Sequence, residues 1–105
     1  MPSINLFTPR AAGTVSLTTS GASSRTSLSL PAGAGGMQVR VKNIDTTNVI
    51  FIEFGDSTVA AALATGVPIG PGETCGFTIP ADATHVAAIA GGGTPVIYFT
   101  PGHGI

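Results

Sequence analysis

Short apolar stretches, broken by glycine and proline about every 8–12 residues, are the feature that most constrains this fold. The clearest is at residues 37–42, where Met37, Val39 and Val41 alternate with polar residues. Such alternation is typical of a strand with one face in a core and the other in water. No strand–helix alternation appears, so we expect an all-β fold: a small antiparallel β-sandwich or jelly-roll-like barrel of about seven to eight short strands.

The chain divides into two parts of different composition. Its 105 residues are enough for one domain. Residues 37–105 carry the strong apolar patterns and form the expected β-sandwich core. Residues 1–36 are rich in Ser, Thr, Gly and Ala, with thin alternations at residues 15–19 and 27–30. We expect this first part to be an extended N-terminal arm or a pair of edge strands.

Glycine and proline also predict the connections in the second half. Residues 91–93 are three glycines, which supply the positive φ values of a tight hairpin between strands at 84–90 and 94–100. Residues 68–72 contain two prolines and two glycines and are predicted to form a loop. Residues 101–105 are predicted to be a non-regular tail.

The Ala-rich segment 58–64 is ambiguous. Ser57 could cap a short helix there that Gly66 would end. A helix of fewer than two turns is marginal without packing, so we favour extended or irregular structure.

Low charge raises the question of a membrane. Only 9% of the residues are charged, and the mean hydropathy is +0.45. The longest apolar run, residues 59–64, is far shorter than the roughly 18 residues of a spanning helix. Residues 1–7 lack the basic and apolar regions of a signal peptide, so we expect neither membrane insertion nor export. We expect instead that other protein covers much of the surface.

The charges are few but unevenly distributed. The net charge of −1 argues against a basic nucleic-acid binder. All four cations precede residue 43, and all five acids follow it. The asymmetry is either chance or a sign of complementary surfaces, for example a cationic N-terminal arm that docks on an acidic partner.

No set of residues predicts catalysis. His85, His103 and Cys75 lack the spacing of a zinc site, and a single cysteine excludes an intrachain disulfide. Cys75 is in phase with apolar strand residues, which favours a buried small side chain. Glu53 interrupts an apolar strand and is expected to be a solvated edge residue or half of an ion pair. We therefore expect no catalytic, metal or cofactor site.

Two strands are apolar on both faces, at residues 49–54 and 95–99. A two-layer sandwich buries one face of each sheet, so the second face needs a cover, either the N-terminal arm or a neighbouring chain. This predicts a protein–protein interface. Its candidate residues are Arg10, Arg25, Val49, Phe51, Val96 and Tyr98.

Several stretches of residues 37–105 resemble one group of proteins. They are the alternating strand 38–41, the segment 49–57, the loop 68–72, the strand 83–89 and the end of the chain, 100–105. With them the sequence resembles small virion proteins encoded by tailed bacteriophages and related prophages. Proteins of this group are small β-sandwiches on the outside of the head, often trimers at the three-fold sites of the capsid.

The resemblance implies a capsid decoration (cement) protein without catalytic residues. Its expected partners are the major capsid protein and itself, as a homotrimer, with no nucleic acid or membrane. It would be made in the host bacterial cytoplasm and end on the capsid surface of the virion. Residues 1–36 lie outside the resemblance, and by analogy they would grip the capsid. The alternative is a carbohydrate- or receptor-binding module, or a connector part, of a phage tail or fibre.

Overall fold

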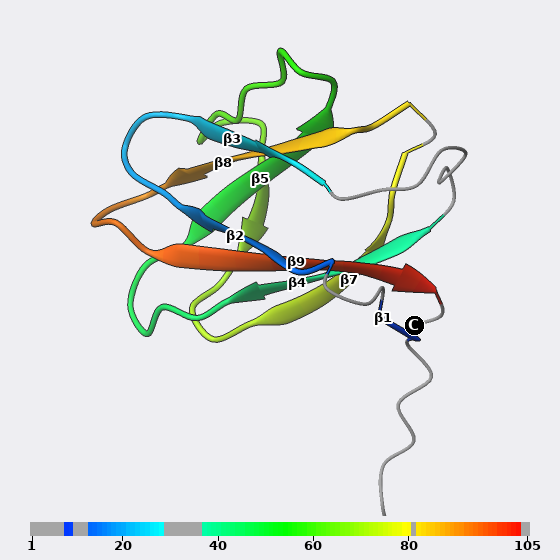
Figure 1. Cartoon of the computed structure of the whole chain (residues 1–105). Coiled ribbons are helices and arrows are strands. Elements are labelled where there is room, and N and C mark those ends of the chain that lie inside the picture. Colours follow the sequence, from blue (N-terminus) through cyan, green and yellow to red (C-terminus); the bar gives the residue numbers. More distant parts are fainter. Residues whose placement is uncertain (1–7, 10–12, 29–36, 81, 104–105) are drawn as a thin grey trace, which may run out of the picture.

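The computed structural model describes residues 8–9, 13–28, 37–80 and 82–103, and within them all the regular secondary structure is β-strand (Figure 1). No helix among these residues is long and apolar enough to cross a membrane. The strands pack as two antiparallel sheets, so the predicted all-β sandwich is confirmed. Their bounds are β1 (Thr8–Pro9), β2 (Val15–Thr18), β3 (Ser24–Ser27), β4 (Gln38–Asn43), β5 (Ile50–Gly55), β6 (Val67–Ile69), β7 (Thr74–Thr78), β8 (His85–Ala90) and β9 (Val96–His103).

The strand order is that of a jelly roll. In the five-stranded sheet the order is β1-β9-β4-β7, with β2 paired to β9 on the same side as β1. The four-stranded sheet has the order β3-β8-β5-β6. The chain therefore crosses between the sheets after β2, β3, β4, β6, β7 and β8 and stays in one sheet from β5 to β6, as it does in double-sheet jelly rolls. The described strands therefore form a sandwich of two sheets with a jelly-roll strand order.

The predicted hairpin at residues 91–93 is wrong. β8 and β9, which these glycines join, lie in different sheets, so the turn carries the chain across the sandwich. A positive φ is nevertheless needed there, since Gly93 has a φ of 62°. Local turn chemistry predicted the reversal of direction, but only the packing of the sheets decided which strands it joins.

Two further predictions about connections are corrected. The predicted loop 68–72 begins with a strand, β6, in which Ile69 lies opposite Ile50 of β5. The predicted tail is partly strand, because β9 continues to His103. Pro101 of β9 lies opposite Val39 and is fully buried, so burial of its ring in the core outweighs its lack of an N–H donor.

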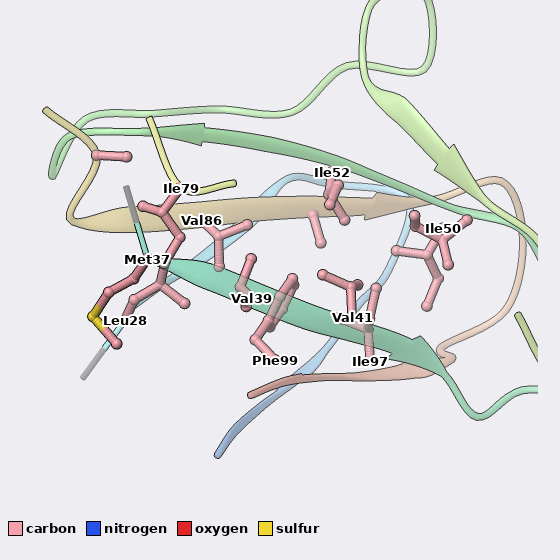
Figure 2. Close-up of a cluster of buried hydrophobic side chains, with 13 residues drawn as sticks. Leu28, Met37, Val39, Val41, Ile50, Ile52, Ile79, Val86, Ile97 and Phe99 are labelled. Carbon is pink, nitrogen blue, oxygen red and sulfur yellow. The ribbon is translucent and has the colours of Figure 1, made fainter. Parts of the chain in front are cut away.

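The core lies between the sheets. In Figure 2 the side chains of Val39, Val41, Ile97 and Phe99 point from the five-stranded sheet toward those of the four-stranded sheet. All four side chains are fully buried, which agrees with the alternation of residues along these two strands. The main cluster consists of Leu28, Met37, Val39, Val41, Ile50, Ile52, Ile69, Ile79, Ala83, Val86, Ala88, Ile97 and Phe99.

The described residues of the first 36 form edge strands. β2 pairs with the first half of β9, with Val15 opposite Phe99, and Val15 and Leu17 pack against the core. β3 pairs with β8. The strand predicted at residues 27–30 lies instead at Ser24–Ser27, and Leu28 just after it is buried. Arg10 and residues 29–36 lie outside the described residues, so the arm prediction is not resolved for them.

Candidate interaction surface

The outer face of the four-stranded sheet is covered by the chain itself. Phe51 of β5 and Ala87 and Ile89 of β8 point away from the main core and form a second apolar cluster. Val59 and Ala61, from the segment that joins β5 to β6, complete that cluster. We call residues 56–66 the covering segment. Its residues 58–64 contain no helix, which agrees with the irregular structure favoured from the sequence.

Hydrogen bonds and close packing hold the covering segment in place. The Arg25 guanidinium donates to the carbonyl oxygen of Val59 at 3.1 Å, and the N–H of Ala61 donates to the hydroxyl of Ser23 at 2.9 Å. The segment also approaches the sheet so closely that a Cβ on Gly66 would lie 2.8 Å from the Cβ of Phe51. The expectation that this face needs the N-terminal arm or another chain is therefore wrong for the four-stranded sheet.

The outer face of the five-stranded sheet has a different character, because hydroxyl side chains dominate it. A row of residues crosses four strands in register: Ser16 lies opposite Tyr98, Tyr98 opposite Lys42, and Lys42 opposite Thr74. In the neighbouring row Thr100 lies opposite Arg40. Such a polar face with one aromatic ring is available for contact with another molecule.

An exposed apolar patch lies at one end of this face. Tyr98 is 38% exposed and Ile44 is 46% exposed, although both are large apolar side chains. Val96 is half-buried and lies beside Ile44, whose N–H donates to the Val96 carbonyl at 3.3 Å. We call Ile44, Val96 and Tyr98 the Tyr98 patch. Lys42 adjoins it, and its ammonium group donates a long hydrogen bond of 3.4 Å to the Thr74 hydroxyl.

The structure separates the candidate interface residues. Val96 and Tyr98 lie together, and Ile44, which the sequence reading missed, lies beside them. Phe51 and Arg25 are on the opposite sheet, in contact with the covering segment. Val49 precedes β5 and is half-buried, with its carbonyl accepting from the N–H of Gly91 at 3.0 Å. Ile44 follows the end of β4, and its exposure comes from the turn there. The alternation of residues in the strand therefore does not predict that exposure.

The described charges do not separate by sign between the faces. Arg25 and Glu53 both lie opposite Ala87 on the outer face of the four-stranded sheet. Arg40 and Lys42 lie on the outer face of the other sheet. The asymmetry along the sequence therefore does not produce one cationic and one acidic surface among the described residues.

Most described titratable side chains have local structural contacts. The hydroxyl of Thr58, with its N–H, holds the pKa of Asp56 below its usual value. Burial raises the pKa of the Cys75 thiol, and the Glu73 carboxylate adds to this rise. His85 Nδ1 lies 2.8 Å from the Thr84 hydroxyl. The described residues hold no group of three His, Cys, Asp or Glu placed to bind a metal ion.

No family model matches the chain, and no curated protein or solved structure matches it.

Proposed function

We propose that this chain is a structural virion protein of a tailed phage, a decoration protein that binds the assembled head and stabilises it. The observation that carries the proposal is the Tyr98 patch, an exposed aromatic and aliphatic surface on an otherwise polar sheet. Tyrosine is enriched among the residues that dominate binding energy at protein interfaces. Two further supports are the resemblance of residues 37–105 and the jelly-roll fold, which is common in viral capsid proteins; the fold support is analogy.

The mechanism would be binding linkage. A protein that binds the assembled lattice but not its separated subunits shifts the equilibrium toward the lattice. The Tyr98 patch would bury its ring against the major capsid protein, while Lys42 and Arg40 on the same face would meet acidic groups of that partner. The homotrimer remains an expectation of the resemblance alone, because the chain itself covers the outer face of β5, one of the two apolar faces that predicted a protein–protein interface.

Co-sedimentation with purified heads that lack this protein tests the proposal. We expect Tyr98→Ala to weaken binding about tenfold or more, since it removes the centre of the patch. Ser16→Ala, directly opposite on β2, is the matched control and is expected to bind as the wild type does. Absence of wild-type binding to heads, or equal binding by both variants, would count against the proposal.

A carbohydrate- or receptor-binding role is the second candidate. It is favoured by one observation: the ring of Tyr98 is exposed on the outer face of the five-stranded sheet, where Ser16 and Lys42 lie opposite it on the neighbouring strands. An aromatic ring with polar neighbours can stack on a sugar and orient it. Labelled protein located on the tail or fibre of virions by negative-stain microscopy, together with glycan binding that Tyr98→Ala abolishes, would favour this role over head decoration.

A further inference from the structure

Among the described strands, β7 is the last of the five-stranded sheet and has an open edge. β7 ends the strand order, and β4 is the described strand with which it pairs. The N–H of Asn43 donates to the carbonyl of Glu73, and the N–H of Ile79 donates to that of Met37. In an antiparallel pair such bonds recur at alternate residues, so the odd-numbered residues of β7 bond to β4. The N–H and C=O groups of Thr74, Gly76 and Thr78 therefore point away from β4.

These outward groups lack a further main-chain partner among the described residues. Between described residues, none of the main-chain hydrogen bonds outside the strand ladders involves Thr74, Gly76 or Thr78. All three residues are exposed, and a Cβ on Gly76 would meet no described atom within 4 Å. The edge thus presents donors and acceptors in the arrangement that another strand could pair with.

Other edges of the two sheets have features that oppose strand addition. β1 and β6 each contain a proline, and β3 contains the exposed Arg25. β2 contacts β3 where the chain crosses between the sheets. Proline and charge are the usual protections of an edge strand, and β7 has neither among its residues Thr-Cys-Gly-Phe-Thr.

The sequence of β7 is also complementary to itself. We infer that β7 pairs antiparallel with β7 of a second copy, around a two-fold axis at Gly76, so that two five-stranded sheets become one continuous sheet. In this register Thr74 lies opposite Thr78 of the other copy, and Gly76 lies opposite Gly76. The three outward-pointing residues of one copy therefore face the same three of the other, and each such pair forms two hydrogen bonds.

The side chains fit this register on both faces. On the outer face two threonine pairs flank the two glycines, and Thr–Thr pairs are favourable across antiparallel strands. On the core side Cys75 lies opposite Phe77 of the other copy. Both are half-buried at the rim of the sandwich, where the Phe77 ring lies 6.0 Å from that of Phe54, and pairing covers them further. The contact is isologous, as two-fold dimers require.

This dimer does not depend on the proposed function, because it is inferred from the outward backbone groups of β7 and not from the Tyr98 patch. It also differs in symmetry from the trimer that the resemblance implies. Sedimentation equilibrium of the purified chain distinguishes them. We expect a species of twice the 10.3 kDa chain mass that increases with concentration between about micromolar and millimolar. A monomer or a trimer throughout this range would overturn the inference.

A proline at the axis tests which edge pairs. The N–H of Gly76 points away from β4, so Gly76→Pro removes an edge donor without removing a bond of the β4–β7 ladder. We expect Gly76→Pro to be a folded monomer and Gly76→Ala, which keeps the N–H, to dimerise as the wild type does. Circular dichroism verifies folding of both. Dimerisation by folded Gly76→Pro would overturn the inference.

Paired charges test the register even if the proline variant does not fold. Thr74→Glu with Thr78→Glu places like charges opposite each other twice across the axis, whereas Thr74→Glu with Thr78→Lys places opposite charges there. We expect the first double variant to be monomeric and the second to dimerise. Amide exchange adds a direct readout: protection at residues 74, 76 and 78 should rise with concentration, while residues 75 and 77, bonded to β4, stay protected. Equal behaviour of the two double variants, or no rise in protection, would overturn the inference.

Discussion

The side-chain amide of Asn43, in β4, donates a hydrogen bond of 3.0 Å to the main-chain carbonyl of Ile69, in β6, and so joins the two sheets. The same amide donates to the Asn48 carbonyl at 2.9 Å, and its oxygen accepts from the N–H of Asp45 at 3.0 Å. Asn43 is fully buried. Every polar atom of its side chain is thus satisfied at the end of the sandwich where the β4–β5 turn meets β6.

Asn43→Ala should therefore be costly. It leaves the Ile69 carbonyl buried without its donor, and we expect a loss of about 2–4 kcal/mol in the free energy of unfolding. Urea denaturation measures this loss. Lys42→Ala, the exposed neighbour on β4, is the control and should change stability by less than about 1 kcal/mol. Similar stability of the two variants would contradict a structural role for Asn43.

The covering segment should tolerate no added methyl group beneath it. A Cβ on Gly55 would lie 2.8 Å from the Cβ of Val59, and one on Gly66 equally close to Phe51. We expect Gly55→Ala and Gly66→Ala each to cost about 1–3 kcal/mol, because the segment must move off the sheet. Gly76→Ala, with open space around it, is the control. Thermal denaturation measures the loss of stability, and limited proteolysis of residues 56–66 measures the movement of the covering segment. Unchanged proteolysis of the two variants would contradict the close packing.

Residues of β2 should be needed for folding, although they belong to the part expected to form an arm or edge strands. Leu17 packs against the core, and Ser16 beside it points outward. We expect Leu17→Asp to cost at least about 2 kcal/mol, because it places a carboxylate against the core, and Ser16→Asp to cost less than about 0.5 kcal/mol. Chemical denaturation compares the two. A harmless Leu17→Asp would show that residues 15–18 are dispensable, as an arm would be.

Acid should weaken the fold through two turn carboxylates. The N–H groups of Thr47 and Asn48 hold the pKa of Asp45 below its ordinary value of 3.8, and the Thr58 hydroxyl and N–H lower the pKa of Asp56 in the same way. A carboxyl whose pKa is lower in the folded state stabilises that state above its unfolded pKa, and the effect is lost as pH falls through the folded pKa. We expect the urea midpoint to fall as pH drops below 3.8.

The double variant Asp45→Asn, Asp56→Asn should show a shallower decrease over about pH 5 to 2, because neither position can then take up a proton. The variant and the wild type are compared by their urea midpoints across this range. Parallel pH profiles would show that these two turns contribute nothing to acid sensitivity.

Alternation in the sequence predicted much of the core correctly. Val39 and Val41, Ile50 and Ile52, and Ile97 and Phe99 are buried in the phase that the pattern indicated. This is possible because side chains of a strand alternate between its faces whatever the strand packs against. The same reasoning identified Val96 and Tyr98 as residues of a second apolar face, although it grouped them with Phe51, which lies on the other sheet.

The sequence by itself determined the β class, the main strands and which of their residues face inward, because these follow from local periodicity and turn residues. The tertiary structure alone decided that Gly93 leads from one sheet to the other, that Val67–Ile69 forms a strand, and that Val59 and Ala61 cover Phe51. It also decided that β7 lies at the edge of the described five-stranded sheet while β4 lies inside it. These outcomes depend on contacts between residues far apart in the chain. The energies of those contacts depend on how the side chains pack together, and no local sequence pattern contains that information.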